Sequence, residues 1–197
     1  MKRIIKDQVT KIIIEKSRFI SHCYNCDSID DMNALIKKEK QINHSANHVC
    51  YASTVLDDGV KTYYNDDGEP SGTAGLQILQ VLKENNLINT LITVTRYFGG
   101  IKLGIPGLSR AYKQSANMCI QDNICNVKLK SLYMCKCEYK TFDSVKKLLE
   151  KYSLEINELK FLHDIEFYVY LDDEEYSKLD SLALELQNQN KTKYCKI

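Results

Sequence analysis

The stretch Thr95-Arg-Tyr-Phe-Gly-Gly-Ile-Lys-Leu-Gly-Ile-Pro-Gly107 decides the local fold and is the most informative segment of the chain. The β-branched run Thr90-Leu-Ile-Thr-Val just before it predicts a buried strand, and residues 108–120 after it predict a helix. A strand, a glycine-rich loop and a helix in this order direct backbone N–H groups and a helix dipole toward an anion. The alternative is a tight connection that needs glycine for steric reasons alone.

Positive charge is concentrated in the same region. Two arginines and two lysines, and no acidic residue, lie between positions 96 and 113. Tyr97 and Phe98 follow Arg96, and cations beside exposed rings are typical of proteins that hold single-stranded nucleic acid. Because these two rings end a strand, at least one of them is expected in the core. We expect the binding site to include Arg96, Gly99, Gly100, Lys102, Gly104, Arg110 and Lys113.

A loop of opposite charge occupies residues 65–73, directly before a helix expected to start near Thr73. Asp66, Asp67 and Glu69 place three carboxylates within four positions, an oxygen-rich set that suits a hard cation such as Mg²⁺. Two alternatives are ion pairs with an arginine of the basic segment and a solvated turn shaped by its Asp, Gly and Pro residues. Opposite charge favours a single cleft in which the acidic and basic loops meet.

His48 and Cys50 are two residues apart on a predicted strand and therefore project to the same face. His48 is expected to line the cleft with its neutral imidazole. A Cys–His nucleophilic pair needs a mutual hydrogen bond and a third, orienting group, so the sequence favours a buried cysteine instead. The eight cysteines are irregularly spaced, and we expect them to be reduced and mostly buried. Cys23 and Cys26 lack a convincing second pair, so no zinc is expected.

Length and charge restrict the remaining classes. A chain of 197 residues suits one large domain or two small ones, and 44% hydrophobic content is ordinary for a globular protein. A net charge of +1 provides no global field toward nucleic acid or an anionic membrane, so electrostatic preference must come from local patches. There is no apolar run of membrane-spanning length and no signal-peptide core, which makes the cytoplasm the expected location.

The order of elements predicts an α+β protein with two domains, residues 1–126 and 130–197. For the second domain the sequence predicts, in order, strand 132–139, helix 141–152, strands 155–161 and 165–171, a helix from Asp172 through Leu186, and a closing strand at 193–197. This βαββαβ order is the ferredoxin-like split unit. The first domain alternates strands and helices, with a hairpin of residues 49–56 and 60–64 and a helix that begins near Ser28.

Three ordered motifs resemble the YigZ/Impact family: Ala46-Asn-His48-Val-Cys50-Tyr-Ala52, Asp66-Asp-Gly-Glu-Pro-Ser-Gly-Thr-Ala-Gly75, and Val94 to Gly104 with Gly107-Leu-Ser-Arg-Ala-Tyr112. The resemblance implies a first domain like the second domain of a small-subunit ribosomal protein and a second domain like the last domain of elongation factor G. It also implies a link to translation. The resemblance further implies that eukaryotic relatives act through an extra RWD domain, which is not expected in this chain, so their partner is not carried over. Asn47 replaces the usual Ser or Thr, and Ile105-Pro106 stiffens the glycine loop.

These observations predict a non-catalytic, translation-related protein that binds RNA or a ribosome-associated surface through residues 96–113, with no cofactor. The acidic loop and His48 would shape that site. One alternative is an enzyme acting on a phosphate-containing substrate, with Mg²⁺ on Asp66, Asp67 and Glu69. Another is a protein-interaction module. Neither a membrane partner nor sequence-specific DNA binding is expected, and the sequence does not predict the oligomeric state.

Overall fold

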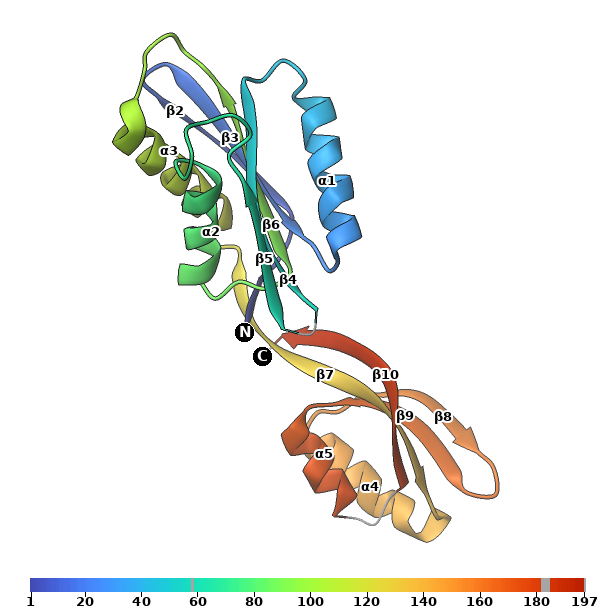
Figure 1. Ribbon diagram of the computed structural model, residues 1–197. Coiled ribbons are helices and arrows are strands. Elements are labelled where there is room, and N and C mark those ends of the chain that lie inside the picture. Colours follow the sequence, from blue (N-terminus) through green and yellow to red (C-terminus); the bar gives the residue numbers. More distant parts are fainter. Residues whose placement is uncertain (58, 182–184, 197) are drawn as a thin grey trace. The chain divides into compact units, whose positions relative to one another are not determined.

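The chain divides into two compact units, residues 1–126 (unit 1) and 127–197 (unit 2). The computed structural model describes residues 1–57, 59–181 and 185–196 (Figure 1). Both units combine helices with an antiparallel sheet, so the chain belongs to the α+β class, as the sequence predicted. Within the described residues, no helix is both long enough and apolar enough to cross a membrane.

Unit 1 is built on a sheet whose strands follow the order β2-β3-β6-β4-β5, with every neighbouring pair antiparallel. The predicted hairpin is present as β4 and β5, and the predicted buried strand is the central strand β6. The bounds are β2 Gln8–Ile14, β3 Ser17–Asn25, β4 His48–Leu56, β5 Val60–Asn65 and β6 Thr90–Tyr97.

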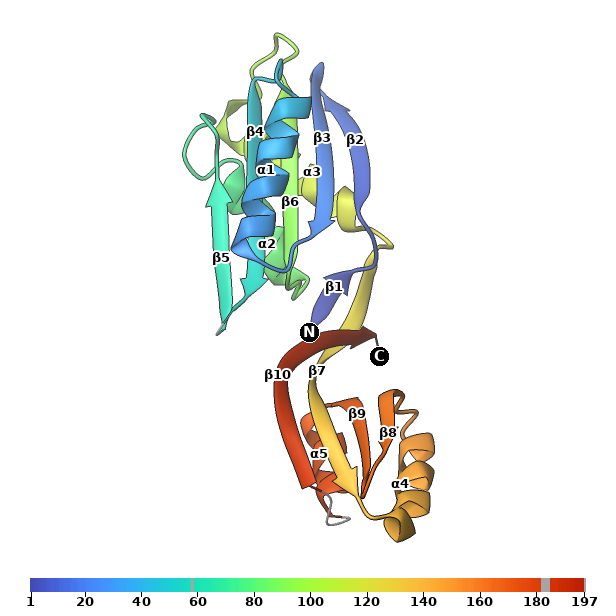
Figure 2. The same cartoon turned by 90° about the vertical axis from the view of Figure 1, so that its right-hand side faces the viewer.

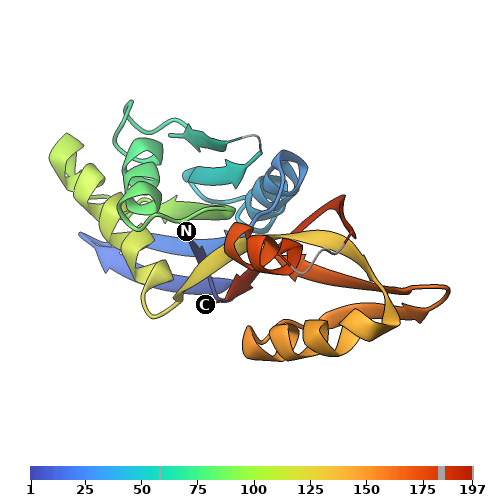
Figure 3. The same ribbon diagram turned by 90° about the horizontal axis from the view of Figure 1, so that it is seen from below.

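Helices cover both faces of this sheet. Figures 1 and 3 show α2 (Gly75–Glu84) and α3 (Gly104–Ile120) on one face and α1 (Ile29–Ile42) on the other. Ser28 is the N-cap of α1, and its side chain accepts a hydrogen bond from the Asp31 N–H at 3.0 Å, which satisfies an otherwise unpaired donor. Because β6 is covered on both sides, it is buried from Thr90 to Arg96, which explains its continuous β-branched sequence.

The main core of unit 1 lies between the sheet and the helices α2 and α3. Phe19 of β3 packs edge-on against Tyr112 of α3, with ring centroids 5.3 Å apart. A second cluster lies under α1 and includes Tyr24, Met32 and Leu91. The short strand β1 (Lys2–Ile4), which the sequence did not predict, pairs with residues 124–126 at the start of β7. Three residues are too few for an alternating pattern to reveal a strand.

Unit 2 has the strand order β10-β7-β9-β8, all antiparallel, with two helices in the βαββαβ order expected from sequence. Its core includes Val145 and Leu149 of α4 and Phe167 and Val169 of β9. The bounds are β7 Ile124–Cys137, α4 Tyr139–Lys151, β8 Ile156–Phe161, β9 Ile165–Leu171, α5 Asp173–Asp180 and β10 Glu185–Lys196.

The predicted helix from Asp172 through Leu186 is wrong in its second half. Asp172 begins α5 with a capping box that involves Glu175, but the helix ends at Asp180. Leu186 lies in β10, opposite Cys135 of β7. Beyond the described end of α5, pairing with the free edge of β7 supplies the backbone hydrogen bonds that a longer helix would have supplied. Residues 182–184 and Ile197 lie outside the described residues.

Candidate functional site

The glycine-rich connection from β6 to α3 is shorter than the sequence predicted. The helix begins at Gly104, not near residue 108, so the loop is confined to residues 98–103. Pro106 falls in the first helical turn, where its missing N–H has no intrahelical partner to lose and its fixed φ suits the helix. Gly104 has a φ of +67°, a left-handed conformation that favours glycine at this start.

Gly99 is required by a close backbone approach. A Cβ atom at this position would lie 2.0 Å from the carbonyl carbon of Lys16, in the turn between β2 and β3. The Gly99 N–H donates to Ser17 Oγ at 3.3 Å, and the Phe98 N–H donates to Asn47 Oδ1 at 2.8 Å. These two N–H groups are therefore already bonded within the protein. Glycine is needed at position 99 because a side chain would not fit there, and not to leave an N–H group free for an anion.

Arg96 is the centre of a buried polar network. It stands opposite His48 of β4 in the sheet and is only 5% exposed. Its Nη1 donates to Glu69 Oε1 at 2.7 Å, and its Nη2 lies 3.4 Å from Ser17 Oγ. The Tyr112 hydroxyl donates to the same Glu69 oxygen at 2.8 Å. The charge of Arg96 is thus compensated by Glu69, although its Nε has no hydrogen-bond partner among the described residues.

The three carboxylates of the acidic loop have separate partners. Asp66 accepts from the backbone N–H groups of Gly72, Ala74 and Gly75 at 2.8–3.0 Å and so caps α2, whose N-cap residue makes no side-chain bond. Asp67 accepts from the Val49 N–H at 2.7 Å and from Lys40 at 2.6 Å. Since Glu69 faces Arg96, these oxygens do not converge on one point. No group of metal-binding side chains occurs among the described residues, so the geometry does not support the Mg²⁺ alternative.

His48 is held in one orientation by the acidic loop. Its Nδ1 lies 2.8 Å from the Asp67 carbonyl oxygen, which assigns the proton of the neutral ring to Nδ1. Its Nε2 lies 3.9 Å from Glu69 Oε1.

Cys50 is not poised as a nucleophile. Burial, with the nearby carboxylates of the acidic loop, raises the pKa of its thiol, and the thiol donates to the Asp66 carbonyl oxygen at 3.0 Å. The neutral thiol is therefore the form present near pH 7.

A hollow of about 370 Å³ lies beside this network and joins the two loops of opposite charge. It contains four of the predicted site residues: His48, Arg96, Lys102 and Gly104. Pro70 contributes from the acidic loop, and Glu69 of that loop pairs with Arg96 at the end of β6, so the acidic loop lies against the basic segment. The complete lining is Asn47, His48, Pro70, Arg96, Phe98, Lys102, Leu103, Gly104, Ile105 and Leu108.

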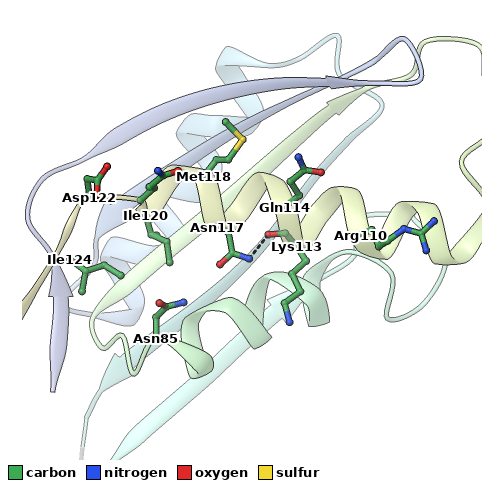
Figure 4. Close-up of a pocket in the computed structure, with 10 residues that line it drawn as sticks. Asn85, Arg110, Lys113, Gln114, Asn117, Met118, Ile120, Asp122 and Ile124 are labelled. Atoms are coloured by element: carbon green, nitrogen blue, oxygen red, sulfur yellow. Dashed lines mark hydrogen bonds between the residues drawn. The ribbon is translucent and has the colours of Figure 1, made fainter.

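The other two predicted cations, Arg110 and Lys113, lie farther along the chain, on α3. Both line a second, broader hollow of about 850 Å³. Figure 4 shows them with Asn85, Asn117 and Ile124. Lys113 is paired with Glu84 at 2.6 Å. The four cations of the basic segment therefore do not form one site. Helical geometry separates them, because Arg96 and Lys102 precede the helix while Arg110 and Lys113 lie two turns into it.

Three exposed apolar side chains lie in or next to the β6–α3 connection; the sequence analysis considered Phe98 as a ring beside Arg96 but missed Ile101 and Ile105. Phe98 is 45%, Ile101 39% and Ile105 64% exposed. The expectation that Tyr97 or Phe98 enters the core is not met, because Tyr97 is only half-buried, with the Arg18 guanidinium 4.1 Å from its ring centroid. The signal that could have found the two isoleucines is their position in the glycine-rich segment, beyond the end of the strand pattern.

Comparison with known proteins places the chain in a family. Residues 15–120 match the Impact N-terminal domain, and the chain belongs to the IMPACT family. It is 35% identical to the IMPACT family member YvyE of Bacillus subtilis over 90% of this chain and 82% of that protein. It is 32% identical to the IMPACT family member YigZ of Escherichia coli over 69% and 68%. A crystal structure of a hypothetical protein, 25% identical, aligns over 94% of this chain and 95% of that chain with a TM-score of 0.65.

Proposed function

We propose that this protein is a translation-related binding protein of the cytoplasm, without catalytic activity, that attaches to RNA or a ribosome-associated surface through residues 98–105, which comprise the β6–α3 connection and the first two residues of α3. We call these residues the binding loop. One observation carries the proposal. The loop exposes Phe98, Ile101 and Ile105 together with Lys102, beside a hollow whose buried charges are already paired. Exposed apolar side chains gathered next to a hollow mark an interaction surface.

The chemistry of the binding loop suits a single-stranded nucleic acid segment. The Arg96 guanidinium lies 5.4 Å from the centroid of the Phe98 ring and makes a cation–π contact with it. With the ring 45% exposed, a base has room to stack on it, and such stacking contributes about 1–3 kcal/mol per base. Lys102, which is exposed, supplies a charge for a neighbouring phosphate. Attraction is local, since the chain has a net charge of only +1.

The translational setting of this proposal comes from the family. The resemblance to the YigZ/Impact proteins implies domains like those of a small-subunit ribosomal protein and of elongation factor G. We therefore also propose that unit 1 is similar to the ribosomal-protein domain and unit 2 to the elongation-factor domain. Unit 2, with its βαββαβ order, would be a second binding or packing module.

Ribosome co-sedimentation with the purified full chain tests the proposal. Phe98→Ala and Lys102→Ala are expected to weaken co-sedimentation at least about fivefold, while the matched control Val60→Ala, also exposed but on the edge strand β5, leaves it unchanged. Treatment of the ribosomes with ribonuclease separates an RNA contact from a protein contact. Binding that is equally strong in all three variants, or no co-sedimentation of the wild type, would refute the assignment of the loop.

A further inference from the structure

The α1 face of the unit 1 sheet is only half covered. Figure 2 shows α1 in front of β4 and β6, with β2 and most of β3 beside it and uncovered. The apolar cluster beneath α1 includes Tyr24 at one end of β3 but no residue of β2. We call the remaining surface the open half-face. It consists of Val9, Lys11 and Ile13 of β2 with Arg18 and Ile20 of β3.

Side chains of β2 alternate strictly between the core and this surface. Ile12 and Ile14 pack against the main core, on the side of α2 and α3. Val9 and Ile13 point the other way and are 56% and 67% exposed. A strand with apolar residues on both of its faces is typical of a sheet covered on both sides. The sequence of β2 therefore suits a layer that unit 1 itself does not supply.

The charge of the open half-face is positive. Lys11 stands opposite Ile20, and Ile13 stands opposite Arg18, so cations and aliphatic side chains alternate across the two strands. None of its five residues is acidic, and the turn Glu15-Lys16 that joins β2 to β3 contributes one charge of each sign. At the α1 margin, His22 is paired with Glu39 at 3.1 Å. A partner complementary to this surface has an apolar stripe bordered by acidic residues.

We propose that the open half-face docks an amphipathic, acidic α-helix of a partner protein, which lies beside α1 on β2 and β3. Two strands at a spacing of about 4.8 Å give a width of about 10 Å, which is the diameter of one helix with its side chains. A helix with apolar residues at i, i+3, i+4 and i+7 covers the aliphatic side chains, and flanking Glu residues reach Lys11 and Arg18.

A protein helix fits this surface better than a nucleic acid does. Single-stranded RNA is held by aromatic platforms, and the nearest ring on this face of β6, Tyr97, is already covered by the Arg18 guanidinium. The five residues of the open half-face include no aromatic ring. This inference does not rest on the binding loop, and either can fail without the other.

A display library of amphipathic 18-residue helices tests the proposal, with the apolar stripe fixed and the flanking positions varied among Glu, Gln and Lys. Selection on the full chain is expected to enrich Glu at the flanks. Binding of the selected peptides should fall at least about tenfold with Ile13→Glu. The matched control is Val60→Glu, an exposed β-branched residue at the other edge strand, which should leave binding unchanged.

Three results would overturn the proposal. The first is a selection with no preference for Glu, or peptides whose binding survives Ile13→Glu. The second is a wild-type dimer in analytical ultracentrifugation that Ile13→Glu converts to a monomer, since the open half-face would then be covered by a second copy. The third is loss of single-stranded RNA binding with Ile13→Glu and not with Lys102→Ala, which would assign this surface to nucleic acid.

Discussion

Removing the Glu69 carboxylate tests whether the Arg96 network is a structural support. The side chains of Glu69 and Arg96 are 3% and 7% exposed, and their atoms meet at 2.7 Å. Glu69→Ala leaves the guanidinium buried without its counter-charge and removes the acceptor of the Tyr112 hydroxyl. Breaking one side of a buried pair costs about 3–5 kcal/mol. In a unit of this size, a loss of that magnitude lowers the melting temperature by roughly 10–20 °C.

A double-mutant cycle separates the pair from the general effect of a cavity. Arg96→Met in the Glu69→Ala background removes the uncompensated charge, so the double variant should recover at least about 1–2 kcal/mol relative to Glu69→Ala alone. Urea unfolding followed by circular dichroism measures the free energies. Glu84→Ala, which breaks the exposed pair with Lys113, is the matched control and should cost less than about 1 kcal/mol. A Glu69→Ala loss no larger than the control, or no recovery in the double variant, would refute the reasoning.

Three further predictions follow from single features of the units. Although burial opposes ionisation, hydrogen bonds from His22 and Tyr24 hold the pKa of Glu39 below its usual 4.5. Glu39→Gln should therefore lower the free energy of unfolding by roughly 1–3 kcal/mol at pH 7. In urea unfolding, the difference between wild type and variant should shrink as the pH falls below about 4.5, because the wild-type carboxylate is then protonated. Of the seven cysteines with described side chains, only Cys125 is not buried, so peptide mapping after native alkylation at pH 8 should find it modified and Cys50 protected. Residues 1–126 alone should give a cooperative thermal transition, whereas a molten product would show that the two units depend on one core.

Elements with a strong local pattern could be predicted from the sequence, and those set by long-range pairing could not. The alternation of β9 and the apolar stripe of α4 are complete within each segment, and both were located to within about two residues. In contrast, β1 and the start of β10 exist because β7 offers them backbone partners. Such pairing depends on residues more than 45 positions away, and no window of local sequence contains it.

The candidate site was predicted in its parts and not in its arrangement. Motif spacing placed His48, Arg96 and the acidic loop together, and the Arg96–Glu69 contact is one of the alternatives that the charges allowed. What the spacing could not give was burial. A guanidinium at the end of a strand looks the same in sequence whether it faces solvent or a carboxylate, and here Tyr112 and Ser17, which carry no charge, complete its surroundings.

Two sets of residues have different roles at this site: one set holds the backbone in place, and the other is exposed to a partner. Arg96 and Glu69 neutralise one another inside unit 1, so their contribution is to fix the β6–α3 connection, and Gly99 locks it against the β2–β3 turn. The side chains left free to meet a partner are those of the binding loop itself, Phe98 and Lys102 among them. Substitutions in the first set should therefore reduce binding only in proportion to the protein they unfold. Substitutions in the second set should reduce binding at an unchanged melting temperature, because they remove partner contacts from a loop whose backbone is held by other residues.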